Sequence, residues 1–348
     1  MAVFYIPDFH ISGTGFNALN KSRDDLHKIY QNLGFQPLLD KKIDLDDRKV
    51  KYFASNTKVL GDYIDIVIDA LDKRCHDSDF LFMDFPFAIK FAGYSKIVSY
   101  ARTKGVKVIF FIHDLDGVRF QNMLLNMVDS ACLDMAYCLI SASSEMDEAL
   151  SQDLRVSNKI RKVNYRYWDY LTEDIENNNN QALICFAGNL AKSSFISQIP
   201  SELISSGLNL YGKGMKETYK GSFKGEFNPQ ELVKVLDGKF GLVWDGNGSS
   251  GCTGNFGKYL KINTSHKFGL YMATGKPVIV WSGSSIADFV IDNRIGIAVN
   301  SLNDIAPLLS KVSVSEYLQM KKNILPIRKD VISGLHLSRV ILESMKEY

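Results

Sequence analysis

Residues 259–281 read YLKINTSHKFGLYMATGKPVIVW, and this stretch indicates the fold class. Thr264 or Ser265 can cap a helix, because a short side-chain oxygen accepts hydrogen bonds from the first backbone N–H groups. Three apolar residues at helical spacing then form one face: Phe268, Tyr271 and Met272. Gly275 ends the helix and Pro277 opens an apolar run, which predicts a buried strand. A helix that leads into a buried strand is typical of α/β folds with parallel sheets.

The same alternation of short apolar runs and longer amphipathic stretches extends along the whole chain. In the first half it predicts strands at residues 3–9, 79–84, 106–113 and 137–141, and helices at 22–33 and 119–135. In the second half it predicts strands at residues 182–187, 208–211, 240–244 and 277–281. The sequence therefore predicts two α/β halves.

The length and composition of the chain predict two domains. Its 348 residues and 39.2 kDa exceed one ordinary core of roughly 100–200 residues. A polar run, TEDIENNNNQ at 172–181, separates the halves, so we expect a first domain at 1–168, a linker at 169–181 and a second domain at 182–328. Pro326 is expected to break or kink the helical tail, and the last part of the tail, 329–348, is expected to cross back onto the first domain.

The overall charge excludes several classes of partner. Lysine and arginine number 41 against 39 aspartates and glutamates, so a net charge of +2 provides no broad field for nucleic acid or an acidic membrane. The N-terminus lacks the pattern of a signal peptide, and no stretch reaches the roughly 18 apolar residues of a transmembrane span. Five cysteines without a C-x-x-C pair favour the reducing cytoplasm. Peripheral attachment at the inner membrane face stays open.

A glycine-rich loop, FHISGTGFNA at residues 9–18, follows the first expected strand. Gly13 and Gly15 allow the backbone to approach a ligand, whose phosphate or sugar the free N–H groups of the loop can bind. Gly13, Gly15 and Ala18 also fit a loose dinucleotide-binding pattern, with Asp40 at a suitable distance further on. A plain flexible turn is the alternative interpretation.

Charged residues follow the expected strand at 106–113, where His113 is succeeded by Asp114, Leu115 and Asp116. Side chains placed directly after a buried parallel strand point toward a ligand rather than into the core. His113, Asp114 or Asp116 can therefore take a proton from an acceptor hydroxyl. The Asp-x-Asp spacing also allows a divalent metal site, and capping of the following helix remains a structural alternative.

Glycine and cationic residues also gather after strands of the second half. Gly188 and Asn189 form a turn, and Lys192 is placed to reach an anion held over it. His266 and Lys267 lie in the first turn of the expected helix, where a cation is unfavourable against the helix dipole unless an anion binds there. Tyr211 ends a strand, where its ring can flank a planar base. The interpretation of Lys267 as an ordinary surface lysine stays open.

Five glycines at residues 246–257 form either a lid over this site or a flexible surface loop.

Several segments resemble one bacterial group of glycosyltransferases. They are FGLVWD at 240–245, YLK at 259–261, SHK at 265–267, GKPVIVW at 275–281, FFIHD at 110–114 and FAGN at 186–189. The group contains glucosyltransferase 3-like enzymes, which extend glycans on serine-rich repeat adhesins, and putative galactofuranosyltransferases of polysaccharide clusters. The resemblance covers most of the chain, and its C-terminal block is the more specific part.

This resemblance implies a GT-B fold, with two Rossmann-like domains, an interdomain cleft and a C-terminal helix that crosses back. It implies a UDP-sugar donor held mainly by the second domain, without an essential metal. Lys192 and Lys267 would hold the diphosphate, and Thr14 would approach from the first domain. The remaining residues of the implied donor site are Gly188, Asn189, Tyr211, Tyr259, Asn263, Ser265 and His266. Related galactofuranosyltransferases often have Asn-Pro-His-Lys where this chain has TSHK at 264–267, which leaves the sugar open.

The sequence therefore predicts a hexosyltransferase that moves glucose or a galactose or galactofuranose unit from a UDP-sugar to a glycan or glycoprotein acceptor. Lys192 and Lys267 would stabilise the leaving UDP, and His113, Asp114 or Asp116 would serve as base if the reaction inverts the anomeric centre. A non-catalytic UDP-sugar-binding subunit and an NAD-dependent oxidoreductase are the alternatives. Association into a homo-oligomer is compatible with the resemblance.

Overall fold

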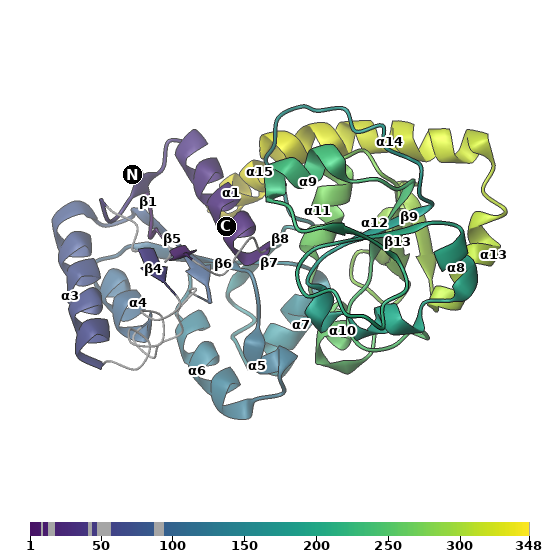
Figure 1. Ribbon diagram of the computed structural model, residues 1–348. Coiled ribbons are helices and arrows are strands. Elements are labelled where there is room, and N and C mark those ends of the chain that lie inside the picture. The colour runs from purple at the N-terminus through teal and green to yellow at the C-terminus, as the bar shows by residue number, and fades with distance from the viewer. Residues whose placement is uncertain (8–9, 13–17, 41–43, 47–56, 87–93, 348) are drawn as a thin grey trace. The chain divides into compact units, whose positions relative to one another are not determined.

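The computed structural model describes residues 1–7, 10–12, 18–40, 44–46, 57–86 and 94–347. The chain forms two compact units, each with its own parallel sheet (Figure 1). Unit 1 comprises Met1–Tyr165 together with Leu337–Tyr348, and unit 2 comprises Arg166–His336. The prediction of two α/β halves with parallel sheets is confirmed.

Unit 1 contains a six-stranded sheet in which all neighbouring strands are parallel. Its order is β3 (Gln36–Pro37), β1 (Val3–Tyr5), β5 (Phe80–Phe85), β6 (Lys107–Ile112), β7 (Cys138–Ser141) and β8 (Arg161–Asn164). A separate pair joins β2 (His10–Ser12) to β4 (Asp44–Asp46). The central strands β5 and β6 are almost entirely buried, as expected for parallel strands covered on both faces.

Helices flank this sheet in the order expected for an α/β unit. They are α1 (Ala18–Asn32), α3 (Thr57–Arg74), α4 (Tyr94–Thr103), α5 (Asp116–Arg119), α6 (Met123–Leu133), α7 (Ser144–Gln152) and α15 (Leu335–Ser344). The single helix expected at 119–135 is wrong, because Gln121 has a φ of +53° and interrupts it. The side chain of Asn122 then caps α6 by accepting a hydrogen bond from the N–H of Leu125.

The C-terminal tail packs on unit 1. Lys107 Nζ lies 2.7 Å from Glu347 Oε1, and Arg161 Nη2 lies 2.7 Å from Glu343 Oε1. Of the break or kink expected at Pro326, the break is wrong, because α14 (Val314–Ser333) continues through this residue. It ends instead at Gly334, which has a φ of +79°. Proline removes one helical hydrogen bond, and burial of the α14 side chains Ile324, Ile327 and Val331 in the core of unit 2 compensates for it.

Unit 2 contains a six-stranded parallel sheet in the order β11 (Ser222–Gly225), β10 (Leu208–Tyr211), β9 (Ile184–Ala187), β12 (Phe240–Val243), β13 (Val278–Trp281) and β14 (Gly296–Val299). The chain adds strands outward from β9 to β11 and then returns to β12 and proceeds in the other direction. This is the doubly wound Rossmann order, and β9 and β12 flank its switch point. Ligands of such sheets bind beyond the carboxyl ends of the strands at that point.

The helices of unit 2 cover both faces of its sheet (Figure 1). They are α8 (Ser201–Ser205), α9 (Pro229–Val235), α10 (Gly254–Tyr259), α11 (His266–Ala273), α12 (Ala287–Asp292), α13 (Ile305–Leu309) and α14, with 3₁₀ turns η1 (Leu190–Lys192), η2 (Ser194–Gln198) and η3 (Leu302–Asp304). Over the parts of the chain that the structure covers, no helix is long and apolar enough to cross a membrane.

The polar segment 169–181, expected to be a linker, has defined partners within unit 2. The backbone N–H of Tyr170 donates to the carbonyl of Val331 at 3.0 Å. The amide of Asn177 is buried and donates to the carbonyl of Val233 at 2.6 Å. These contacts attach the segment to α9 and α14, which is why unit 2 begins at Arg166.

Candidate functional site

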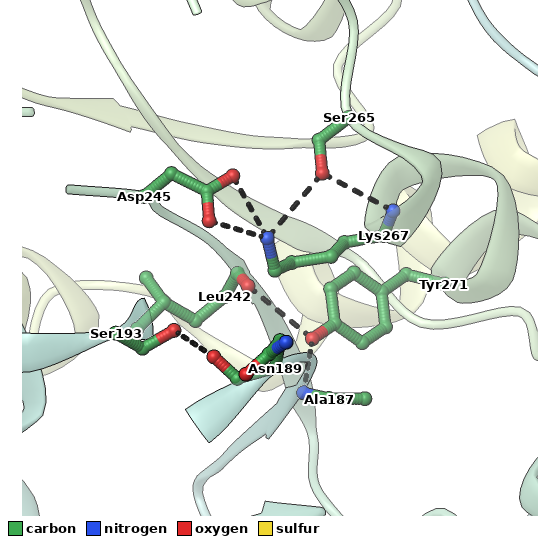
Figure 2. A network of polar contacts seen from close by, with 8 residues as sticks. All are labelled: Ala187, Asn189, Ser193, Leu242, Asp245, Ser265, Lys267 and Tyr271. Atoms are coloured by element: carbon green, nitrogen blue, oxygen red, sulfur yellow. Dashed lines mark hydrogen bonds and ion pairs between the residues drawn. The ribbon is translucent and has the colours of Figure 1, made fainter. Parts of the chain in front are cut away.

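An ammonium group is held at the start of α11, on the carboxyl side of the sheet of unit 2 (Figure 2). Ser265 caps the helix, as predicted, and its hydroxyl accepts a hydrogen bond from the N–H of Lys267 at 3.3 Å. Lys267 Nζ lies 2.8 Å from both carboxylate oxygens of Asp245 and 3.5 Å from Ser265 Oγ. The Lys267 side chain is 12% exposed and that of Asp245 is 29% exposed, so solvent reaches the pair.

This ammonium lies at the switch point of the sheet. Asp245 follows β12, and Gly188 follows β9, which pairs with β12. A Cβ atom at Gly188 would lie only 2.9 Å from Lys267 Cε, so glycine gives the lysine side chain its space. Lys267 Nζ also lies 5.3 Å from the centre of the Phe186 ring. The cation is therefore placed where parallel α/β sheets bind ligands.

Tyr271 fixes the position of α11 over the two strands. Its hydroxyl accepts a hydrogen bond from the N–H of Ala187 at 3.1 Å, at the end of β9, and lies 3.2 Å from the carbonyl oxygen of Leu242 in β12. A Cβ atom at Gly241 would lie 2.2 Å from the Tyr271 ring, so only glycine admits the ring there. Tyr271 lies one helical turn after Lys267 and thus holds the lysine in register with the switch point.

The electrostatics of this site favour a second anion. A lysine in the first turn of a helix opposes the positive end of the helix dipole. Asp245 compensates for the charge of Lys267. A lysine ammonium has three donors and can share them between Asp245 and a phosphate oxygen. The positive end of the α11 dipole would attract the same phosphate.

Lys192 and Asn189 lie on the turn after β9, on the same side of the sheet. Lys192 is exposed at the end of η1, and its Nζ lies 5.2 Å from the centre of the Phe256 ring in α10. The backbone oxygen of Asn189 accepts a hydrogen bond from Ser193 Oγ at 2.9 Å, which shapes this turn below the Lys267–Asp245 pair (Figure 2). The structure thus collects Gly188, Asn189 and Lys192 near the end of β9 as the sequence predicted.

Three further predicted donor-site residues are engaged in the protein itself. Tyr211 is buried, and its hydroxyl accepts from the N–H of Asp237 and lies 3.3 Å from the carbonyl oxygen of Val235, while burial raises its pKa to about 12. Its ring therefore packs in the core instead of presenting a face beside a base. Tyr259 is buried at the end of α10, and the Asn263 side chain accepts a hydrogen bond from the N–H of Thr264.

His266, the first residue of α11, stacks on an aromatic ring that the sequence did not single out. The centre of its imidazole lies 4.7 Å from that of Trp168, with 24° between the planes. Trp168 is buried and belongs to the first residues of unit 2. Trp168 therefore stacks on the residue that precedes Lys267 in the chain. Its fluorescence can report on changes near the Lys267 ammonium.

In unit 1, the charged turn after β6 divides into a buried histidine and two ion-paired carboxylates. His113 is 3% exposed, and its Nε2 lies 3.4 Å from Asp84 Oδ1 in β5. Arg119 forms ion pairs with both Asp114 and Asp116. The two carboxylates therefore already have a cationic partner, and this ion pairing makes them weaker proton acceptors. Among the residues covered by the structure, no group of His, Cys, Asp and Glu side chains could hold a metal ion.

Asp84 is the centre of a buried polar cluster that the sequence did not reveal. His27 Nε2 lies 3.0 Å from Asp84 Oδ2, and Arg23 Nη1 lies 3.7 Å from the same oxygen. Both partners come from α1, while Asp84 lies near the carboxyl end of β5 and His113 follows β6. Burial opposes ionisation of Asp84, but the adjacent imidazoles of His113 and His27 outweigh it and hold the pKa of this carboxyl below its usual range.

The remaining predictions concern the glycine-rich loop. Gly13, Thr14 and Gly15 lie outside the residues that the structure describes. Of the residues that the sequence analysis missed, Asp245 carried a usable signal, because it follows an apolar strand as Asp114 does. Tyr271 was assigned only to the apolar face of its helix, although a buried tyrosine hydroxyl normally finds a polar partner.

Both halves of the chain match the domains of one known protein family. Residues 4–160 match the glucosyltransferase 3-like N-terminal domain, and residues 184–344 match the glucosyltransferase 3-like C-terminal domain. The β-1,6-galactofuranosyltransferase WbbI of Escherichia coli K12 is 30% identical over 273 residues, which is 77% of this chain and 79% of the relative. Glucosyltransferase 3 of Streptococcus parasanguinis is 24% identical over 254 residues, covering 72% of this chain and 73% of the relative.

Solved structures share the fold over the full length. Anabaena Alr3699/HepE in complex with UDP aligns with a TM-score of 0.63 at 11% identity, covering 99% of both chains. An α,α-trehalose-phosphate synthase from Burkholderia xenovorans in complex with glucose-6-phosphate aligns with a TM-score of 0.63 at 9% identity, covering 100% of both chains. At these identities the likeness concerns the fold, and it confirms the predicted GT-B class with two Rossmann-like domains.

Proposed function

The chain belongs to the glucosyltransferase 3-like family, and we propose that it transfers a hexose from a UDP-sugar to a hydroxyl group of a carbohydrate acceptor. One observation carries the proposal: Lys267 is held at the N-terminus of α11, over the switch point between β9 and β12. A cation, the positive end of the α11 dipole and the glycine turn at 188 together form a suitable site for a diphosphate.

The donor site would act mainly on the leaving group. Negative charge develops on UDP as the bond between the sugar and the diphosphate breaks, and a fixed cation stabilises it most when it does not need to reorganise. Tyr271 and Asp245 hold Lys267 in place beforehand. Lys192 is exposed on the neighbouring turn and would contribute a second cation. In this proposal the lysines neutralise the diphosphate, and no metal is required.

The acceptor side is assigned to unit 1. Burial, with a smaller contribution from Arg23, lowers the pKa of His113 to about 4, so its imidazole is neutral near pH 7. A neutral imidazole accepts a hydrogen bond from a sugar hydroxyl but is a weak base for removing its proton. Both ring nitrogens of His113 are also buried, and Asp114 and Asp116 are ion-paired with Arg119, so all three predicted acceptor-side residues are engaged within unit 1.

The transferred hexose is proposed as glucose or galactofuranose. These are the sugars that appear in the names of the relatives, a galactofuranosyltransferase and a glucosyltransferase. A UDP-release assay with UDP-glucose, UDP-galactose and UDP-galactofuranose, each with glycan acceptors ending in GlcNAc or galactose, decides between them. Turnover with one donor and loss of turnover in Lys267→Ala are the expected results. UDP binding without turnover on any donor and acceptor would instead favour a non-catalytic binding subunit.

Location and assembly complete the proposal. All five cysteines are free and buried, which suits a reducing cytoplasm. Sedimentation of the chain with and without inner-membrane vesicles tests peripheral attachment. Light scattering coupled to size-exclusion chromatography tests whether the chain forms a homo-oligomer.

A further inference from the structure

One face of the long helix α14 points outward from unit 2 (Figure 1). The buried side chains of this helix, Ile324, Ile327 and Val331, recur every three or four residues and pack into the core of unit 2. On the opposite side of the helix a second set recurs with the same spacing and faces solvent. We call this set the α14 stripe, and its members are Val314, Leu318, Lys322, Leu325 and Lys329.

The α14 stripe exposes large aliphatic side chains. Val314 is 77% exposed, Leu325 is 59% exposed and Leu318 is 57% exposed. A single exposed leucine is common on protein surfaces. Three aliphatic residues aligned over roughly 16 Å of one helix, at about 1.5 Å per residue, instead indicate a contact surface.

Two lysines alternate with the aliphatic residues of the stripe. Lys322 lies between the two leucines, Lys329 lies one turn after the second leucine, and both are exposed. Neither forms an ion pair within the described residues, whereas Arg328 in the same helix is paired with Asp174. The positive charge of both lysines can therefore act on a partner outside the chain.

The acidic residues of α14 lie off the stripe. Glu316 belongs to the capping box, where its carboxylate accepts hydrogen bonds from the N–H and the hydroxyl of Ser313, both at 2.7 Å. Asp330 lies about 100° round the helix from Lys329. The stripe is therefore apolar and cationic without a carboxylate of its own.

This combination fits the surface of an anionic bilayer. Aliphatic side chains enter the boundary between headgroups and acyl chains, while the long lysine stems let the ammonium groups reach lipid phosphates. Nucleic acid would leave the aliphatic side chains in water, and a purely apolar protein face would leave the lysines without a counter-charge.

We propose that the α14 stripe docks unit 2 on a membrane surface that contains anionic phospholipids. Val314, Leu318 and Leu325 enter the interface, and Lys322 and Lys329 contact the lipid phosphates. The inference deepens, and to that extent rests on, the peripheral attachment included in the proposed function. It does not depend on the transfer reaction.

Unit 1 exposes an apolar face as well, but without lysines. It is formed by α6 and the turn before it, with Phe120, Met123, Leu124, Met127 and Val128. The sequence of α6 contains no lysine or arginine, and Arg119 before it is paired with Asp114 and Asp116. This face does not complement anionic lipid and therefore provides a matched control.

Co-sedimentation of the full chain with vesicles tests the inference. Vesicles of phosphatidylcholine mixed with phosphatidylglycerol present an anionic surface, and vesicles of phosphatidylcholine alone present the same apolar interior without net charge. We expect binding to the mixed vesicles that weakens as salt screens the lysines, and little binding to phosphatidylcholine alone. No binding to the mixed vesicles, or equal binding to both kinds, overturns the proposal.

Two double variants separate the apolar and the cationic contributions. Leu318→Ser with Leu325→Ser removes two exposed aliphatic side chains, and binding should be at least tenfold weaker. Lys322→Gln with Lys329→Gln removes two charges, and binding should fall roughly twentyfold and depend less on salt. Circular dichroism and the affinity for UDP should be unchanged in both variants. Full vesicle binding by either variant contradicts the proposal.

Leu124→Ser with Met127→Ser is the matched control on α6, because it removes two exposed apolar side chains from a face without lysines. Its vesicle binding should equal that of the unmodified chain, and loss of binding in this variant alone would assign docking to unit 1. A dimer in size-exclusion chromatography that the α14 variants dissociate would instead make the stripe an interface between two copies. Either result overturns the proposal.

The docking surface and the transfer reaction fail in different ways. Turnover of a UDP-sugar with a soluble acceptor, but no vesicle binding, contradicts the docking surface alone. Vesicle binding without turnover on any donor and acceptor contradicts the transfer reaction alone.

Discussion

The two units place polar clusters at the carboxyl edges of their sheets but bury them to different extents. In unit 1 the Asp84 cluster lies near the carboxyl ends of β5 and β6 and is closed off from solvent. In unit 2 the Lys267–Asp245 pair lies beyond the carboxyl ends of β9 and β12 and is partly exposed. A parallel sheet directs polar side chains to the same edge in both cases, and burial decides what they can do there.

The difference concerns how easily each cluster exchanges partners. Every charge in a buried cluster needs a fixed partner, because an uncompensated charge is strongly destabilising. Asp84 therefore has Arg23, His27 and His113 around it. An exposed pair loses little when it opens, because water and a ligand replace the partner. We conclude that the first cluster holds groups in position, whereas the second can bind an incoming anion.

The largest expected effect follows from removing one carboxylate from each cluster. Asp84→Ala leaves Arg23 without its buried counter-charge and should lower the free energy of unfolding by about 3–5 kcal/mol. Asp245→Ala removes a partly exposed partner and should lower the free energy of unfolding by about 1 kcal/mol or less. Chemical denaturation followed by circular dichroism measures both. Equal losses in the two variants would break the distinction between a fixed and an exchangeable cluster.

Tryptophan fluorescence assigns these losses to a unit. The chain has three tryptophans, Trp168, Trp244 and Trp281, and all three belong to unit 2. Fluorescence therefore reports unfolding of unit 2, while circular dichroism reports both units. In Asp84→Ala, unit 1 is expected to unfold at a lower denaturant concentration than unit 2. The circular dichroism signal should then change at lower denaturant concentration than the tryptophan fluorescence.

The next effect is a pH dependence that belongs to unit 1. The pKa of folded His113 is about 4, against 6.5 for the ordinary group, so between these values the unfolded chain binds more protons. Stability should then rise with pH across this window, by up to about 3 kcal/mol. Denaturation between pH 4.5 and 7 measures the slope. His113→Gln should remove this contribution, and an unchanged slope in that variant would assign it to other groups.

A smaller loss is expected for ligand binding in unit 2. Lys267→Ala removes one charged hydrogen bond to the diphosphate, which typically contributes about 1.5–3 kcal/mol. We therefore expect UDP to bind at least tenfold more weakly, as measured by isothermal titration calorimetry. Lys261→Ala is the matched control, because Lys261 is exposed and its Nζ lies 5.9 Å from the centre of the Trp281 ring. Similar losses in both variants would point to general charge rather than to the Lys267 site.

The sequence predicted the central strands of both sheets but none of the strands at their edges. The strands at 80–85, 107–112 and 208–211 consist mostly of apolar residues (FLFMDF, KVIFFI and LNLY), because helices cover both of their faces. Edge strands need no such run. β8 reads RKVN and β11 reads SFKG, and neither has a fully buried residue, so their hydrophobic pattern is absent. The four edges, β3, β8, β11 and β14, are defined by pairing with a neighbour that the sequence alone does not show.

The site was predictable where the signal is local. The cap at Ser265 and the cation at Lys267 lie within one helical turn, and their conflict with the helix dipole is visible in the sequence. Partners that are distant in sequence were missed for a physical reason. Asp245 lies 22 residues from Lys267, and Asp84 lies 57 residues from His27. Only the folded sheets bring these side chains together.

The smallest expected effect concerns the sign of the charge at position 245. Asp245 both holds Lys267 and repels a bound diphosphate, and these two effects oppose each other. Asp245→Asn keeps an oxygen that can accept a hydrogen bond from Lys267 Nζ, but it removes the negative charge. Because the pair is partly exposed, the lost attraction between Asp245 and Lys267 is worth about 1 kcal/mol or less. A diphosphate carries more than one charge, so relief of repulsion should exceed this loss, and UDP should bind a few-fold more tightly. Calorimetry at low and high salt measures the change, which should shrink as salt screens the charges. Weaker binding in Asp245→Asn would instead show that Asp245 acts mainly by holding Lys267, and the pair in unit 2 would then resemble the fixed cluster of unit 1.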